Sequence, residues 1–194
     1  HAIALDRVGG VHFNVAAFTN LTEDHLDFHK TMEHYCDTKA QLFSRCDAAV
    51  MNRDDEWYPR LSAHCECPRI TVSTKQEADI QTTNVCLLSD GIRFTTRSDN
   101  TELEVSVPIP GRFTVCNTLT VLGILKALGI DLNEAVKVLA KVEGVKGRIE
   151  VVPTPGNDFT VIINMIISLA KLLQCTILKR PLIIEDKLLP IIGS

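Results

Sequence analysis

The sequence predicts an α/β fold in which crossover helices connect a mostly parallel sheet and a small antiparallel β section is attached to it. A buried apolar run at 13–18, a helical pattern from about Thr31 and a second apolar run at 47–51 follow one another. Strand, helix and strand in this order form the unit of a parallel sheet. Later in the chain, two β-rich runs flank the turn sequence Ser-Asp-Gly at 89–91, which is typical of an antiparallel hairpin.

The helical pattern in the first half has a clear start and one apolar face. Thr31 is a suitable N-cap because its hydroxyl can accept a hydrogen bond from a free N–H of the first turn. Apolar side chains then recur at helical spacing: Met32, Tyr35, Cys36, Leu42 and Phe43. We therefore expect one face of this helix to pack on the sheet.

A β-rich section occupies residues 68–109. Its short runs lie at 70–73, 84–88, 92–96 and 102–107. The prolines and the glycine at 108–111 end the last run, because proline cannot continue a strand ladder. We expect this section to be an insertion or an edge attached to the parallel core.

Helices and then strands return in the last third of the chain. The apolar run at 114–128 predicts a well-buried helix that ends at Gly129. Asp131 with Glu134 three residues later has the form of a capping box and predicts a helix to about Val142. Two further strands are predicted at 148–152 and 159–163.

Composition and charge exclude several classes of protein. The 194 residues suffice for about one compact domain, and 45% hydrophobic with 23% charged residues exclude a disordered chain. A net charge of -4 provides no basic surface, so we expect neither a nucleic acid nor a membrane as partner. Seven cysteines at irregular spacing indicate reduced thiols in a cytoplasmic protein. Cys65 and Cys67 form a close pair, but no second pair completes a zinc site.

The first candidate site is the polar run TNLTEDHLDFH at 19–29, directly after the first strand. In open α/β sheets, ligands bind beyond the carboxyl ends of the strands. His25 and His29 are four residues apart, so on a helix they share a face. Two interpretations stay open: a metal or phosphate site, and a solvated acidic helix start.

Lys39 is the second candidate, because its spacing from Tyr35 and Phe43 places it on the apolar face of its helix. A lysine there either extends its ammonium group to water or loses its proton, since burial lowers the pKa of an amine. A neutral amine can react with carbon dioxide to give a carbamate, which is an anionic oxygen ligand for Mg²⁺. The pattern alone leaves both outcomes open.

Two further candidates follow glycine-containing runs. Asn117 comes shortly after Pro-Gly-Arg-Phe at 110–113, in the first turn of a predicted helix, where its amide can bind a base or a phosphate. Arg148 follows Gly147, and its guanidinium can bind phosphate oxygens with two hydrogen bonds. The alternatives are a loop-to-helix junction at Asn117 and a surface ion pair at Arg148.

Taken together, these runs resemble the Mur ligase family, and most closely the MurE type, which adds the third peptide residue to UDP-N-acetylmuramoyl-L-alanyl-D-glutamate. The match covers about residues 1–164 in the family's order. It is carried by His1-Ala2 with Arg7-Val8, FTNLTEDHLDFH at 18–29, Met32-Glu33 with Tyr35, Lys39 and Leu42-Phe43, Asn52 with Asp54-Asp55, PGRFTVCN at 110–117, and GVKGRIE at 144–150.

The resemblance implies an ATP-dependent amide-bond ligase of peptidoglycan precursor synthesis. In such enzymes ATP phosphorylates a substrate carboxylate, and an amine then displaces the phosphate. The resemblance implies that His25 binds Mg²⁺ and that Lys39 is carbamylated and helps to hold a second Mg²⁺. It implies ATP contacts for Asn117 and Arg148. Contacts with the UDP-linked substrate are implied for Arg7, Thr19 and Asn20.

The resemblance further implies the partners: a UDP-N-acetylmuramoyl dipeptide and an amino acid, either diaminopimelate or lysine, bound by a monomeric parent protein in the cytoplasm. The family's G-T-x-G-K-T-[ST] phosphate loop is not among these residues. The family's D-Y-A-H-T-P-D run after Ile163 is replaced by Asn-Met-Ile-Ile, before a helix-like stretch at 168–173.

We therefore expect residues 1–164 to be a partial central domain that is truncated at both ends and has an exposed sheet edge. We expect residues 165–194 to be a divergent tail of the kind that a frame shift produces. The family's N-terminal UDP-binding and C-terminal amino-acid-binding domains are expected to be absent, and this piece alone to be inactive. Two alternatives stay open: a non-catalytic product of a decayed gene, and another ligase of the superfamily, of the folylpolyglutamate or cyanophycin type.

Overall fold

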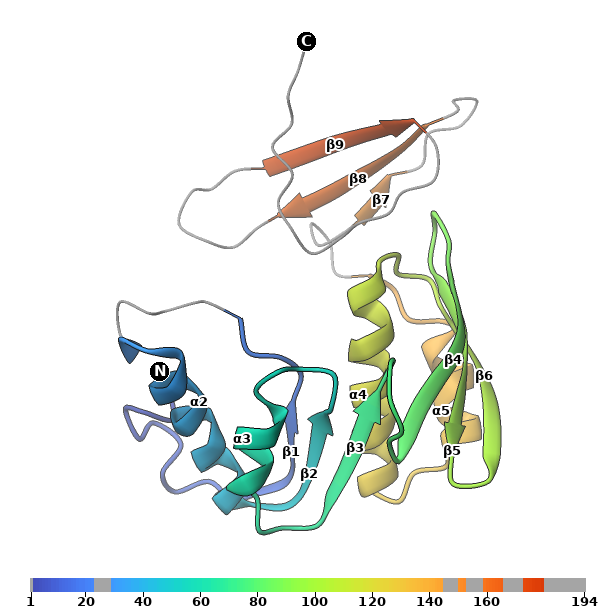
Figure 1. The fold of residues 1–194 in the computed structure, drawn as a ribbon. Coiled ribbons are helices and arrows are strands. Elements are labelled where there is room, and N and C mark those ends of the chain that lie inside the picture. The colour runs from blue at the N-terminus through green and yellow to red at the C-terminus, as the bar shows by residue number, and fades with distance from the viewer. Residues whose placement is uncertain (1, 23–28, 145–149, 153–158, 166–172, 180–194) are drawn as a thin grey trace.

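The computed structural model describes residues 2–22, 29–144, 150–152, 159–165 and 173–179. Its strands form two sheets (Figure 1). The elements in chain order are β1 (Phe13–Phe18), α2 (Met32–Ala40), the 3-10 helix η1 (Gln41–Arg45), β2 (Cys46–Asn52), α3 (Tyr58–Ala63), β3 (Arg69–Ser73), β4 (Ile80–Leu87), β5 (Ile92–Ser98), β6 (Thr101–Val107), α4 (Arg112–Ala127), α5 (Leu132–Leu139), β7 (Glu150–Val152), β8 (Phe159–Met165) and β9 (Leu173–Lys179).

The larger sheet has six strands in the order β1-β2-β3-β4-β5-β6, and β1 to β4 run parallel. α2 and η1 connect β1 to β2, and α3 connects β2 to β3, which confirms the predicted strand–helix–strand unit. β1 lies at one end of this sheet. Among the described residues it pairs with β2 alone.

The antiparallel section begins at β4, because β5 pairs antiparallel with both β4 and β6. The predicted turn closes the first hairpin, where the N–H of Leu88 donates to the carbonyl oxygen of Gly91 at 2.9 Å. β3 was expected in this section, but it pairs in parallel with β2. The difference arises because the partner of a short strand depends on residues distant in sequence, which its own composition does not reveal.

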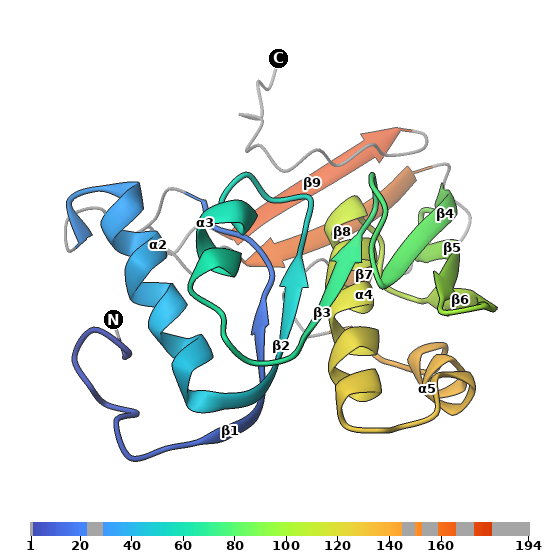
Figure 2. The ribbon, with the colours of Figure 1, turned by 60° about the horizontal axis from the view of Figure 1, so that its bottom comes forward.

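The two faces of the parallel strands bury different side chains. α4 packs on β1 to β5 and α5 packs on β6, whereas α2 and α3 lie on the opposite face (Figure 2). The α4-side core consists of Val50, Val72, Ile80, Ile92, Phe94, Val105, Val107, Val115, Leu119, Leu122 and Ala135. The α2-side core consists of Ala16, Phe18, Leu21, Cys36, Ala40, Phe43, Cys46, Ala49, Met51 and Leu61. Strand alternation explains the division, since Val50 and its two neighbours in β2 face opposite sides.

α4 approaches the sheet closely. A Cβ atom added at Gly123 would lie 2.6 Å from Cγ1 of Val50, so a larger side chain has no room there. The helix begins two residues before its predicted start. Gly129 follows it with a φ of +73°, the left-handed conformation expected of a C-terminal glycine.

The predicted N-caps are both confirmed. The hydroxyl of Thr31 accepts the N–H of His34 at 3.2 Å at the start of α2. The Asp131 carboxylate accepts the N–H of Asn133 at 2.8 Å at the start of α5. The expected capping box is not closed, because Glu134 accepts a hydrogen bond from the following Lys137 side chain instead. α5 ends three residues before its predicted end.

The smaller sheet is antiparallel, with β8 between β7 and β9. The predicted strands at 148–152 and 159–163 are confirmed as β7 and β8, although 148 and 149 lie outside the described residues. β9 was not predicted, because 168–173 looked helical. Leu173 instead opens a strand that pairs with β8, and 168–172 are not described. Within the described parts of the chain, no helix has the length and apolar character that crossing a membrane requires.

Candidate functional site

Polar loops gather where β1, β2 and β3 end. Because these strands are parallel, their carboxyl ends lie at the same edge of the sheet. The loops that leave this edge begin at Thr19, Arg53 and Thr74. We call this region the carboxyl edge.

Asn52 and Asp55 join the loop after β1 to the loop after β2. The buried Asn52 donates from Nδ2 to the carbonyl oxygen of Thr19 at 2.7 Å. The Asp55 carboxylate accepts the backbone N–H of Leu21 at 3.1 Å. The backbone is therefore held on both sides of Asn20, which orients the peptide groups around it.

Lys39 reaches this loop from α2. Its Nζ donates to the carbonyl oxygen of Asn20 at 3.4 Å and lies 5.0 Å from the centroid of the Tyr35 ring. A carbonyl oxygen and the face of a phenol ring both attract an ammonium group, and the Lys39 side chain is half-buried between them. The buried His29 stacks on the same ring at 4.5 Å between centroids.

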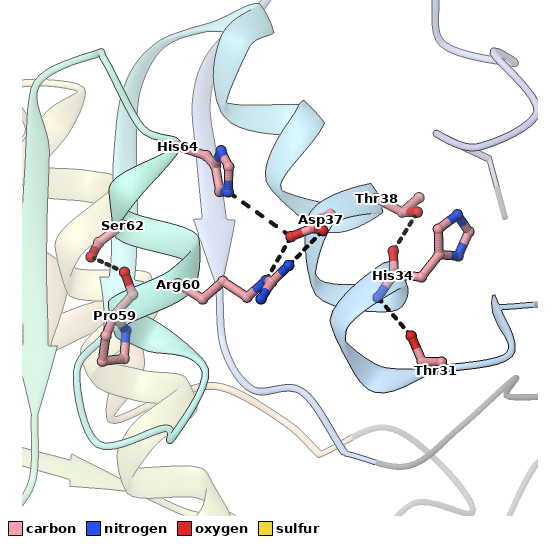
Figure 3. Close-up of polar contacts among 8 residues, drawn as sticks. All are labelled: Thr31, His34, Asp37, Thr38, Pro59, Arg60, Ser62 and His64. Carbon is pink, nitrogen blue, oxygen red and sulfur yellow. Dashed lines mark hydrogen bonds and ion pairs between the residues drawn. The ribbon is translucent and has the colours of Figure 1, made fainter.

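A bidentate ion pair holds α2 against α3 (Figure 3). Arg60 donates from Nε and Nη2 to the two carboxylate oxygens of Asp37 at 2.7 and 2.8 Å, and His64 Nε2 lies 3.9 Å from the same carboxylate. The hydrogen bond from Arg60 holds the pKa of Asp37 below its usual value. Since Asp37 is two residues before Lys39, this pair anchors the turn of α2 from which Lys39 extends.

Asp54 joins the loops after β2 and β3. Its carboxylate accepts hydrogen bonds from the hydroxyl of Ser73, from the N–H of Thr74 at 2.6 Å and from the hydroxyl of Thr74 at 2.7 Å. Burial acts to raise the pKa of Asp54, but these hydrogen bonds outweigh it and lower the pKa. The Ser73 hydroxyl in turn accepts the N–H groups of Lys75 and Gln76 at 3.0 and 2.8 Å.

Asn117 is exposed in the second turn of α4, one turn later than expected because the helix begins at Arg112. The preceding residue, Cys116, has its thiol pKa raised to about 11, first by burial and then by the negative charges of Asp54 and Asp55. α4 packs on β2 and β3, two of the strands whose carboxyl ends form this edge.

Three of the predicted site residues therefore lie together at the carboxyl edge: Thr19, Asn20 and Lys39. Arg7 is exposed in the segment before β1. Its neighbour Asp6 pairs at 3.2 Å with Arg45, the residue directly before β2, so Arg7 lies towards the amino ends of the strands. His25 and Arg148 lie outside the described residues.

Several side chains that build this edge have no role predicted from the sequence: Asn52, Asp54, Asp55 and Ser73. The signal that could have found the first three is the polar run that directly follows a buried strand, the same signal that located Thr19 and Asn20. Across the described part of the chain, no group of three or more His, Cys, Asp or Glu side chains could hold a metal ion.

Comparisons with known proteins agree with one another. Residues 1–125 match the model of the Mur ligase middle domain. The chain is 40% identical over 182 residues to the UDP-N-acetylmuramoyl-L-alanyl-D-glutamate--2,6-diaminopimelate ligase of Gloeobacter violaceus, with 91% of this chain and 37% of that protein covered. The ligase of the same name from Xylella fastidiosa is 41% identical over 154 residues, with 76% and 31% covered.

A solved structure of a UDP-N-acetylmuramoyl-L-alanyl-D-glutamate--2,6-diaminopimelate ligase superposes with a TM-score of 0.74 at 28% identity, over 79% of this chain and 33% of that one. The chain thus spans about a third of the length of the relatives that it matches.

Proposed function

Because this chain belongs to the Mur ligase family, we propose that it supplies part of an ATP-dependent amide-bond ligase of peptidoglycan precursor synthesis. The proposed reaction adds an amino acid to UDP-N-acetylmuramoyl-L-alanyl-D-glutamate through an acyl phosphate. Diaminopimelate is the proposed amino acid, since the relatives at 40% and 41% identity are named for it, and lysine is the alternative. We propose a monomer in the cytoplasm.

The observation that carries this proposal is the contact of Lys39 with the loop after β1. Its Nζ approaches the Asn20 carbonyl at the carboxyl edge, where a ligand of an α/β sheet binds. Thr19 and Asn20 would then orient the UDP-linked substrate from this loop. Asn52 and Asp55 would act through that loop as positioning residues, because their hydrogen bonds hold its backbone.

Mg²⁺, when bound, would neutralise negative charge on the transferred phosphoryl group. A carbamate on Lys39 would provide an anionic oxygen ligand, and His25 a nitrogen ligand. Part of this set fits the structure, because Lys39 extends from an anchored turn of α2 to the carboxyl edge. Carbamylation requires the neutral amine, so the reaction with carbon dioxide releases the proton that the Asn20 carbonyl and the Tyr35 ring otherwise stabilise.

The remaining residue roles are proposals from the family resemblance. Asn117 would bind ATP from the exposed side of the second turn of α4. Arg148 would bind the ATP phosphates. Arg7 would reach the UDP-linked substrate from the segment before β1.

The test uses the complete reading frame that contains these 194 residues. The expected result is phosphate release that requires ATP, UDP-N-acetylmuramoyl-L-alanyl-D-glutamate and diaminopimelate together. Release with lysine alone would change the proposed amino acid. Release with a folate or cyanophycin substrate, or no release with any substrate, would refute the muramyl function.

Lys39→Ala in that protein is expected to lower the rate of phosphate release at least a hundredfold, because an anionic ligand is lost. Acetate should restore part of the activity by supplying a carboxylate in the vacated space. Lys141→Ala removes an exposed lysine two residues after the end of α5 and serves as the matched control. We expect it to leave the rate of phosphate release unchanged. An unchanged rate for Lys39→Ala would remove Lys39 from the mechanism.

A further inference from the structure

Three thiols meet near the amino ends of β2 and β3, at the opposite end of these strands from the carboxyl edge. Cys46 is the first residue of β2, and Cys65 and Cys67 lie in the loop between α3 and β3. The Sγ of Cys67 is 3.6 Å from the Sγ of Cys46 and 3.5 Å from the Sγ of Cys65. We call these three residues the thiol cluster.

We propose that the thiol cluster is a site of reversible oxidation, at which a peroxide converts Cys67 and one of its two neighbours into a disulfide. The sequence shows only the close pair Cys65 and Cys67. Cys46 joins them because β2 and β3 are hydrogen-bonded neighbours, with the N–H of Ala49 donating to the carbonyl oxygen of Pro68 at 2.9 Å.

The three sulfurs differ in exposure. Cys46 is 6% exposed at the margin of the α2-side core, and its Sγ donates to the carbonyl oxygen of Phe43. Cys65 and Cys67 are half-buried, so a small oxidant can reach them from solvent. The Sγ of Cys65 donates to the carbonyl oxygen of Cys67, which keeps these two residues together. The cluster thus combines two thiols that a solvent oxidant can reach with a third, Cys46, that is buried and held by a hydrogen bond to Phe43.

Cys67 is the central sulfur of the cluster, so a sulfenic acid formed there has a thiol within reach on either side. Burial, followed by the hydrogen bond with Cys67, raises the pKa of Cys46 to about 12. Burial and the hydrogen bond with Cys67 likewise raise the pKa of Cys65 to about 11. Both of these thiols stay protonated at neutral pH, which disfavours them as the first site of attack. We therefore place the first oxidation at the half-buried Cys67, which lies between them.

The oxidation proceeds in two balanced steps. The Cys67 thiolate attacks one oxygen of hydrogen peroxide, an S–O bond forms, the O–O bond breaks and hydroxide leaves, which gives a sulfenic acid. The sulfur of Cys46 or Cys65 then attacks the sulfenic sulfur, the S–O bond breaks, and the thiol proton leaves with the hydroxyl group as water. Two thiols lose two electrons and the peroxide gains them. A dithiol reductant reverses the change.

The experiment treats the folded 194-residue chain with hydrogen peroxide, alkylates the remaining thiols and maps the peptides by mass without reduction. We expect a disulfide that joins Cys67 to Cys46 or to Cys65, at a rate independent of protein concentration, and its loss on adding dithiothreitol. Cys86→Ser removes an exposed thiol elsewhere on the sheet and should leave this rate unchanged. Oxidation confined to Cys86 in the parent chain would refute the proposal.

Cys67→Ser is the decisive variant. It should abolish the disulfide and slow the loss of the other two cluster thiols at least tenfold, whereas a Cys46–Cys65 disulfide formed at the parent rate would overturn the proposal. If circular dichroism shows that this variant does not fold, the double variant Cys46→Ser/Cys65→Ser replaces it. That variant leaves Cys67 without a partner, so dimedone should label its sulfenic acid, and absence of labelling would refute the proposed first step.

Discussion

The two faces of the six-stranded sheet are built from the same strands but from different chemistry. The α4-side core is made almost entirely of branched aliphatic side chains, with Phe94 and Ala135. The α2-side core contains Cys36, Cys46 and Met51 and borders both the Lys39 contact and the thiol cluster. The comparison indicates that one face provides stability, whereas the other gives up part of its apolar packing to carry reactive groups.

The largest loss of unfolding free energy should follow the truncation of an aliphatic side chain in the α4-side core. Leu122 is fully buried, and Leu122→Ala should lower the free energy of unfolding by about 3 kcal/mol, because it leaves a cavity. Cys36→Ala, at a fully buried site on the α2 side, should lower it by about 1 kcal/mol. Denaturant unfolding measures both. Val121→Ala, on the exposed side of α4, is the control, and equal losses at Leu122 and Cys36 would break the comparison.

A smaller loss of unfolding free energy is expected for a substitution where α4 packs closely on β2. Gly123→Ala should lower the free energy of unfolding by about 2 kcal/mol, because the new Cβ atom meets the Val50 side chain. The loss should shrink markedly in a Val50→Ala background, where the clashing methyl groups are absent. A double-mutant cycle from denaturant unfolding measures this coupling. Equal losses in the two backgrounds would show that the close approach does not limit packing.

The carboxyl edge should respond to pH through Asp54. Its pKa is lowered in the folded state, so the stability it contributes is present above the ordinary carboxyl pKa and is lost as pH falls through the lower folded value. Asp54→Asn should lower the free energy of unfolding by about 1–2 kcal/mol at neutral pH and flatten its decline below about pH 4. Asp90→Asn, in the exposed β4–β5 turn, is the control. An unchanged acid profile for Asp54→Asn would contradict this assignment.

The smallest effect is expected on the surface between α2 and α3. Arg60→Ala should lower the free energy of unfolding only slightly, because exposed ion pairs contribute little, and salt should reduce the difference. The same variant should raise the pKa of Asp37, which a carboxylate NMR titration would detect. Lys137→Ala, which breaks the exposed pair with Glu134 in α5, is the matched control. A loss as large as that of Leu122→Ala would show that this pair is a main support of α2.

The sequence predicts elements well where their hydrophobic period extends over several residues. β1, β5 and α4 lie within two residues of their predicted bounds because each presents an extended apolar pattern. α3 is absent from the prediction because it has six residues and a single buried side chain, Leu61, which is too few to establish a period. β9 is absent from the prediction because the sequence pattern at 168–173, which leads into it, is typical of a helix.

The candidate site likewise contains one residue that a local pattern predicts and several contacts that it does not predict. Lys39 is visible in the sequence because a charged residue on an apolar helical face is a one-dimensional signal. The hydrogen bond between Asp54 and Ser73 spans 19 residues, and the contact between Cys46 and Cys67 spans 21. Both contacts depend on the parallel pairing of β3 with β2, and no local sequence pattern predicts that pairing.

The strand order of the larger sheet has a consequence for how the molecule folds. Each strand from β2 to β6 pairs with the strand that precedes it in the chain. The connections from β3 to β6 are short, so the entropic penalty of closing them is small, whereas helices lie in the connections from β1 to β2 and from β2 to β3. The sheet can grow by one strand at a time as the polypeptide leaves the ribosome, with no strand waiting for a partner that has yet to be synthesised.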